Sequence, residues 1–154
     1  MGILRARTMF AGGALLLLTS VLSGGLAAGT QEAKPGSARS AWDGVYTGEQ
    51  AERGRALYLE ACAGCHAKDL RGDGTAPSLI EESFSFQWDD TTVGELFGRI
   101  RTFMPSDRPN SLPSQSYRDI VAFILQSNKF PPGDRPLDAD VEVLQQIRIT
   151  AKRP

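Results

Sequence analysis

The pentapeptide CAGCH, residues 62–66, constrains this chain more than any other stretch of its sequence. It holds both cysteines, Cys62 and Cys65, and the only histidine, His66, among 154 residues. A thiol pair at this spacing, followed directly by an imidazole, suits three kinds of site: a dithiol redox centre, part of a metal site, or a point of covalent haem attachment. The remaining residues have to distinguish among these three.

The inventory of other side chains favours haem attachment. A dithiol redox centre usually accompanies a βαβ pattern, which the sequence does not show. A structural zinc site needs four ligands, commonly Cys or His, and the chain offers only three such side chains. A structural disulfide suits an exported protein, but it gives no role to the adjacent histidine. Haem attachment uses all three side chains, because the thiols add to two vinyl groups and the imidazole lies within reach of the iron.

The N-terminal segment, residues 1–28, has the pattern of an export signal. Arg5 and Arg7 form a positively charged start, residues 9–22 are mostly apolar, and small residues follow. We expect a periplasmic protein whose signal is removed, so that no stable membrane span remains. The alternative is an uncleaved anchor, because residues 8–30 carry no charge and are about long enough to span a bilayer.

Removal of the signal leaves Met104 as the only methionine, since Met1 and Met9 are lost with it. A methionine thioether opposite histidine is a known ligand pair of haem iron, and it raises the reduction potential. We therefore predict His66 and Met104 as the two axial ligands of the iron. The alternative for Met104 is an ordinary core side chain that fills a gap.

Two further residues are candidates for the surroundings of the haem. The carbonyl of Pro77 can accept the N–H that a metal-bound histidine normally donates to a second group. Trp88 can donate its indole N–H to a haem propionate. The alternative for Trp88 is a place in the pocket wall.

Helical spacing of apolar residues is the main secondary-structure signal. It appears in three segments, at 48–61, 93–101 and 115–126, with a weaker one around 137–144. Strand-like alternation is too sparse to predict a sheet. The sequence therefore predicts an all-α protein, and its formal net charge of −1 argues against a general nucleic-acid binder.

The expected domain organisation has three parts. The signal is followed by small, polar residues over 29–41, which predict a flexible leader. The structured domain is expected over 42–154, with 129–154 as a C-terminal extension packed on it. About thirty residues rich in Gly, Ser and Asp separate the first two predicted helices. A loop of that length suggests that something fills the space beneath it, as a bound macrocycle would.

These features together resemble the class I c-type cytochromes, which are small monohaem electron carriers. The resemblance covers nearly all of the chain after the signal and rests on CAGCH, the proline in the following loop, Met104-Pro105 and the helix YRDIVAFIL. It implies a cytochrome c fold, with three main helices and loops wrapped around one covalently bound haem c. It also implies that the first and last helices cross. The residues expected at that crossing are Gly54, Tyr58, Ile120 and Phe123.

The stretches WDGVYTGEQAERGRALY, WDDTTVGELFGRIRTFMP and FILQSNKFPPGDRPL are similar to a narrower bacterial subgroup of monohaem cytochromes. Its members occur fused to, or beside, dehydrogenases that depend on pyrroloquinoline quinone (PQQ). The chain departs from the subgroup at Ala67 and Asn110, where glycine is common. Asparagine tolerates left-handed backbone better than most residues, so neither change argues against iron ligation.

The resemblance implies a one-electron carrier rather than an enzyme, either free or as the cytochrome subunit of a dehydrogenase complex. A quinoprotein dehydrogenase would be the electron donor, and a terminal oxidase or another cytochrome the acceptor. The alternative function is that of a haem protein with an open distal site, such as a peroxidase-like enzyme or a gas sensor. Met104 distinguishes the two, because a bound thioether closes that site.

Overall fold

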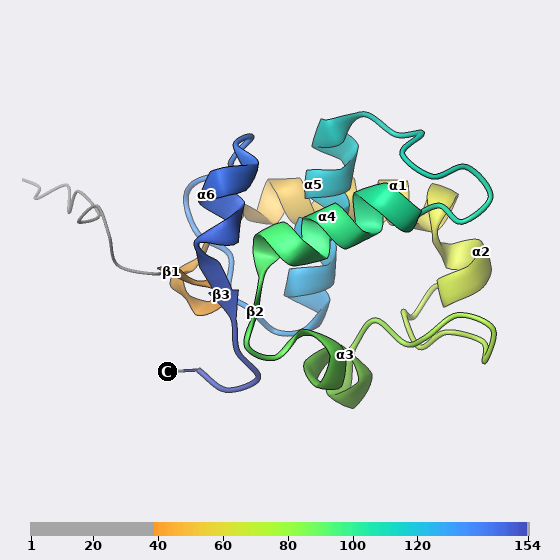
Figure 1. Cartoon of the computed structure of the whole chain (residues 1–154), viewed down its shortest axis with the longest axis horizontal. Coiled ribbons are helices and arrows are strands. Elements are labelled where there is room, and N and C mark those ends of the chain that lie inside the picture. The colour runs from red at the N-terminus through yellow and green to blue at the C-terminus, as the bar shows by residue number, and fades with distance from the viewer. Residues whose placement is uncertain (1–38, 154) are drawn as a thin grey trace, which may run out of the picture. The chain divides into compact units, whose positions relative to one another are not determined.

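The structure is a computed structural model that describes residues 39–153. The predicted signal (1–28) and residues 29–38 of the predicted leader lie outside this range. The elements in chain order are β1 (Arg39–Ser40), the 3-10 helix η1 (Ala41–Asp43), α1 (Gly48–Ala61), α2 (Ala63–His66), α3 (Glu81–Trp88), β2 (Thr91–Thr92), α4 (Val93–Phe103), α5 (Ser114–Ser127), α6 (Val141–Gln145) and β3 (Ile147–Ile149). Figure 1 shows the strands gathered at one end of the described domain and α2 at the other.

The three main predicted helices are present as α1, α4 and α5. α1 has the predicted bounds, whereas α4 and α5 extend slightly beyond theirs. Local capping explains where α1 and α4 begin. The Thr47 side chain accepts the Gln50 N–H, and Thr92 and Glu95 form a reciprocal capping box. The weaker fourth segment forms the short helix α6.

Two parts of the secondary structure were not predicted. The loop after His66 contains helix α3, in which only Phe84 and Trp88 are buried, one turn apart. Phe86 on the same helix is 95% exposed, so the apolar residues do not keep to one face and the helical period is weak. Part of the long loop is therefore helical, and its Phe84 and Trp88 are among the side chains that fill the space beneath it.

The prediction that the chain forms no sheet was wrong. β3 lies between β1 and β2, parallel to the first with Arg39 opposite Ile147, and antiparallel to the second with Thr92 opposite Arg148. Strands of two or three residues are too short to give a readable alternation. Because β1 and η1 include residues 39–41, the structured part begins before Trp42, within the range assigned to a flexible leader.

The core of the domain forms where α1 meets α5. A Cβ on Gly54 would lie 1.8 Å from the carbonyl oxygen of Asp119, so only glycine permits this approach of the two backbones. Beside it, the Tyr58 and Phe123 rings pack with their centroids 5.3 Å apart, and Ile120 is buried. The helix contact expected at these four positions is thus present.

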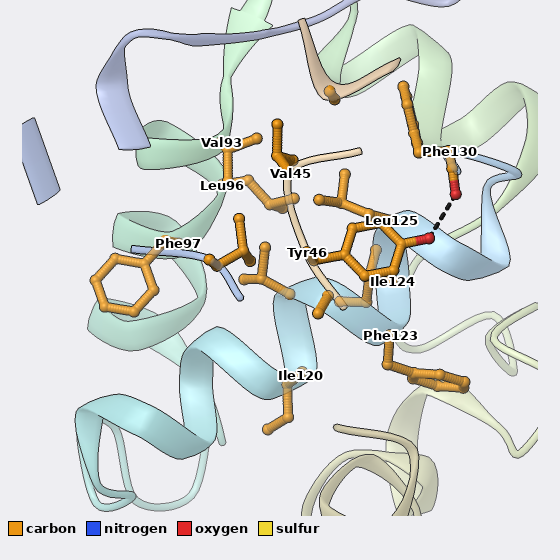
Figure 2. Close-up of a cluster of buried hydrophobic side chains, with 14 of the residues drawn as sticks. Val45, Tyr46, Val93, Leu96, Phe97, Ile120, Phe123, Ile124, Leu125 and Phe130 are labelled. Carbon is orange, nitrogen blue, oxygen red and sulfur yellow. Dashed lines mark hydrogen bonds between the residues drawn. The ribbon is translucent and has the colours of Figure 1, made fainter. Parts of the chain in front are cut away.

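A second group of buried side chains joins α4 and α5 to the segment before α1 (Figure 2). The Tyr46 hydroxyl donates to the carbonyl of Phe130, which ties this segment to the chain after α5. The labelled members of the cluster are Val45, Tyr46, Val93, Leu96, Phe97, Ile120, Phe123, Ile124, Leu125 and Phe130. Within residues 39–153, no helix is long and apolar enough to cross a membrane.

Candidate cofactor site

A cavity of about 400 Å³ opens among α1, α2, α3, α4 and α5. This volume lies within the range of pockets that bind small ligands and cofactors. All of the site residues predicted from the sequence line it: Cys62, Cys65, His66, Pro77, Trp88 and Met104. Apolar side chains of four helices, among them Phe84, Leu96, Ile100, Ile120 and Ile124, form much of the remaining wall.

The thiol pair and the histidine are brought together where α1 passes into α2. Cys62 caps the C-terminus of α1, with its N–H donating to the carbonyl of Tyr58 at 2.9 Å. The N–H groups of Cys65 and His66 donate to the carbonyl of Cys62 at 3.2 and 3.0 Å. This one-turn helix places two sulfur atoms and the imidazole at the same cavity.

The imidazole of His66 is buried and held by one hydrogen bond. Its Nδ1 lies 2.9 Å from the carbonyl oxygen of Pro77, and the residue is 7% exposed. A carbonyl only accepts, so Nδ1 carries the proton in this contact, and the tautomer that can bind a metal has its lone pair on Nε2. An imidazole in this tautomer is oriented to ligate a metal through Nε2. The contact expected between these two residues is therefore present.

A tight loop delivers Pro77 to the histidine. The N–H of Gly72 donates to the carbonyl of His66 at 2.9 Å, which turns the chain back on itself. Gly72 has φ +74°, and a Cβ there would lie 2.2 Å from the carbonyl oxygen of Ala76. Glycine is thus required for the loop to close, and closure aims the Pro77 carbonyl at His66.

The residue after the motif adopts a costly backbone conformation. Ala67 has φ 60° and ψ 160°, a region that residues other than glycine rarely occupy. The Tyr58 hydroxyl lies 2.7 Å from the Ala67 carbonyl and 3.2 Å from the His66 carbonyl, which holds the turn in place. Burial, together with the nearby Cys62 and Asp69, raises the pKa of Tyr58, so this donor stays protonated.

Met104 lies at the C-terminal end of α4, half-buried at the cavity. It caps the helix, and its N–H donates to the carbonyl of Ile100 at 2.8 Å. Its own carbonyl accepts the Tyr117 hydroxyl at 2.9 Å, and that hydroxyl also accepts the Leu112 N–H at 3.3 Å. Tyr117 is the first residue of the stretch YRDIVAFIL, and nothing in that local pattern shows what its hydroxyl binds.

The thiols differ in exposure. Cys62 is half-buried and Cys65 is exposed, and both are free. Burial, and to a smaller extent the neighbouring Cys65 thiol, raises the pKa of Cys62 to about 11. Cys62 is therefore a neutral thiol at pH 7 in an apolar surrounding.

The donor set of the cavity fits haem c better than a bare metal ion. The residues that line it carry one imidazole, one thioether and two thiols, among mostly apolar neighbours. Soft thioether and imidazole ligands suit haem iron, and the thiols suit covalent attachment of the ring. Trp88 is buried on α3 beside Phe84, as part of that wall.

The comparison with known families agrees with this donor set. Residues 49–124 match the family model described as "Cytochrome C oxidase, cbb3-type, subunit III", and this range includes CAGCH and Met104. Residues 49–124 form a class I cytochrome c domain. Its cofactor is haem c, with Cys62 and Cys65 as the thiol pair of the attachment motif, and its role is electron transfer.

One solved structure is similar in part to this chain. It is titled "Crystal Structure of the Sulfane Dehydrogenase SoxCD from Paracoccus pantotrophus" and is 23% identical in sequence, with a TM-score of 0.48. The alignment covers 80% of the present chain and 68% of the other. Among curated protein sequences, none is significantly similar to the chain.

Proposed function

We propose that the protein is an exported carrier of single electrons, with His66 and Met104 as the axial ligands of its haem iron. The observation that supports this most directly is that the only histidine and the only methionine after residue 28 line one cavity with both cysteines. Bound haem c supplies a one-electron Fe(III)/Fe(II) couple. The residues of the chain determine how the haem is bound, what its reduction potential is and where a redox partner can approach it.

His66 serves as the fixed ligand in this proposal. Its Nδ1–H donates to the Pro77 carbonyl, so the ring keeps one orientation and presents Nε2. A hydrogen bond of this kind also makes the imidazole a stronger donor to the metal. The loop closed at Gly72 is what keeps that acceptor in place.

Met104 serves as the second ligand in this proposal. Its N–H is bonded to the Ile100 carbonyl, and its carbonyl is bonded to the Tyr117 hydroxyl. A thioether favours the ferrous state, and an apolar wall that excludes water acts in the same direction. If His66 and Met104 both bound the iron, small molecules would find no open site on it, and electron transfer would be favoured over ligand binding.

Electrons would cross at the edge of the cavity where the attachment motif reaches the surface. Gly64 and Cys65 are exposed, and Phe103, next to Met104, is 52% exposed. A small surface of this kind suits brief encounters with a redox partner, as is common for transient electron-transfer complexes.

The proposed donor is a PQQ-dependent dehydrogenase, and the proposed acceptor is a terminal oxidase or another cytochrome. This part rests on the sequence resemblance to the subgroup found beside such enzymes. Mixing the oxidised protein with a purified PQQ-dependent alcohol or sugar dehydrogenase and its substrate should reduce the haem within the enzyme's turnover time. No reduction with any member of that class would remove this donor from the proposal.

Attachment and export are tested together by mass spectrometry. Protein recovered from the periplasm of a host with haem-attachment machinery should have lost about 28 residues at its predicted signal and gained one haem. The variant with Cys62 and Cys65 both changed to Ser should lose the haem mass and keep the same processing. A wild-type chain of unmodified mass would contradict covalent attachment.

A further inference from the structure

We propose that the C-terminal extension, residues 129–153, positions Met104 by bracing helix α4. This inference rests on the proposed function, because it concerns Met104 as the second axial ligand. The segment that matches the cytochrome c family ends at residue 124, so the extension lies beyond it. Besides contacts with β1, η1 and the segment before α1, the extension contacts the beginning of α4, the helix whose end carries Met104.

The first of these contacts is strand pairing at the start of α4. β3 runs antiparallel to β2, with Ile149 opposite Thr91 and Arg148 opposite Thr92. Thr92 is also the N-cap of α4 and accepts the Glu95 N–H at 3.1 Å. No linker separates the strand from the helix, so the extension fixes the N-terminal end of α4.

The chain just before β2 is tied to the same extension. The N–H of Asp90 donates to the carbonyl of Ile149 at 2.9 Å, and the N–H of Ala151 donates to the Asp89 carboxylate at 2.7 Å. Arg148 forms an ion pair with Asp90. These contacts surround the first residues of the strand that leads into α4.

The second contact is the packing of α6 on α4. A Cβ on Gly94 would lie 2.6 Å from Cγ of Gln145, 2.8 Å from its backbone nitrogen and 2.9 Å from its Cα. The two helices therefore touch through their backbones at this point, and Leu144 beside it is 1% exposed. α4 cannot move here without displacing α6.

Helix α4 carries this constraint to the cavity. It has 11 residues, and Met104 caps its far end. Leu96 and Ile100, on the intervening turns, line the cavity. Because a helix of three turns moves nearly as a rod, a shift at Gly94 changes where Met104 lies relative to His66.

Gly94→Ala and Gly98→Ala form a matched pair for testing this in the full, haem-loaded protein. Both add one methyl group to the same helix, but the space around Gly98 is open, whereas Gln145 fills the space at Gly94. Two quantities are measured in the oxidised protein: the long-wavelength Met–iron absorption band, and the rate at which added imidazole replaces Met104. A variant that only lowers the free energy of unfolding, with Met104 still in its wild-type position, should change neither the band nor the replacement rate.

We expect imidazole to replace Met104 roughly tenfold faster in Gly94→Ala, since overpacking by one methyl group can shift a local opening equilibrium by that factor. In Gly98→Ala the rate should stay within about twofold of the wild-type value, because the added methyl group meets open space. An unchanged rate in Gly94→Ala, even with a lowered unfolding temperature, would overturn the proposal, because the extension would then stabilise the fold without acting on Met104.

A milder variant covers the case in which Gly94→Ala does not accumulate with haem. Ala151→Pro removes the N–H that binds Asp89 without adding bulk to the helix joint. It should also speed replacement of Met104, and an unchanged rate would again overturn the inference. A wild-type protein without a Met–iron band would instead contradict the proposed function, so the two failures are distinguishable.

Discussion

The Tyr117 hydroxyl donates a 2.9 Å hydrogen bond to the carbonyl oxygen of Met104, joining α5 to the residue proposed as the second iron ligand. Tyr117 is 1% exposed, so the bond is shielded from water. This contact holds the backbone of Met104 at the C-terminal end of α4, whereas the extension contacts the N-terminal end of that helix. α5 therefore contributes to the site through the Tyr117 hydroxyl as well as through its apolar side chains.

Tyr117→Phe should release Met104 without changing the shape of the core. Loss of one buried hydrogen bond costs about 1 kcal/mol, and part of that cost falls on the Met104 turn. We expect faster replacement of Met104 by imidazole in the oxidised protein, measured by stopped-flow absorbance. Tyr46→Phe is the matched control, because it removes a buried hydroxyl bonded to Phe130, away from Met104. Equal rates in the two variants would contradict a positioning role for Tyr117.

Ala67→Gly should stabilise the folded protein. Ala67 occupies a backbone region that glycine adopts freely, and the strain of an ordinary residue there is of the order of 1 kcal/mol or more. We expect the midpoint of chemical unfolding to rise by the equivalent of about 1 kcal/mol. Asn110→Gly, at φ 57°, should have a smaller effect, because asparagine tolerates that conformation. A fall in stability for Ala67→Gly would show that the turn is not strained.

Gly54→Ala should be severely destabilising. The added methyl group would lie 1.8 Å from the backbone carbonyl of Asp119, so α1 and α5 would have to separate. We expect a loss of about 3 kcal/mol or more in the free energy of unfolding, together with a low yield of haem-loaded protein. Gly48→Ala adds the same group to the same helix with no atom within 4 Å, and it should be close to neutral. Similar losses for both would exclude a special role for the crossing.

Stability should decline at alkaline pH in a way that Tyr46 explains in part. Burial raises the pKa of Tyr46 from 10.0 to about 12, so the folded state holds its proton where the unfolded state loses it. Its contribution is complete below pH 10 and falls between pH 10 and 12, by up to about 1.4 kcal/mol per pH unit. Tyr46→Phe should flatten that part of the profile in urea titrations. The same slope in both proteins would rule Tyr46 out as its source.

Local signals explain which parts of the fold could be predicted. The bounds of α1 follow from the Thr47 cap and the spacing of its apolar side chains, both contained within a few residues. Helix α3 and the short sheet depend on partners far along the chain. β3 pairs Ile147 with Arg39, more than a hundred residues away, and strands this short leave no periodic trace.

The site followed a similar division. Residue chemistry was enough to predict that His66, Met104 and Pro77 lie at one site, and all three line the cavity. A metal-bound histidine donates its second N–H to an acceptor, and haem iron can take a second ligand from the protein. The roles of Tyr117 and Gly94 could not be predicted, since a hydroxyl or a missing side chain shows its purpose only when its neighbour is known. Those neighbours are the Met104 carbonyl and the backbone of Gln145.

The visible absorption spectrum of oxidised Met104→Ala, set beside that of wild type, tests the central claim most directly. We predict a long-wavelength Met–iron band in the wild type that disappears in the variant, with a lower midpoint potential and rapid cyanide binding. Phe103→Ala, which alters the exposed neighbouring side chain, should keep the band. If Met104→Ala left the spectrum and the rate of cyanide binding unchanged, Met104 would not be a ligand, and the protein would be a haem protein with an open distal site.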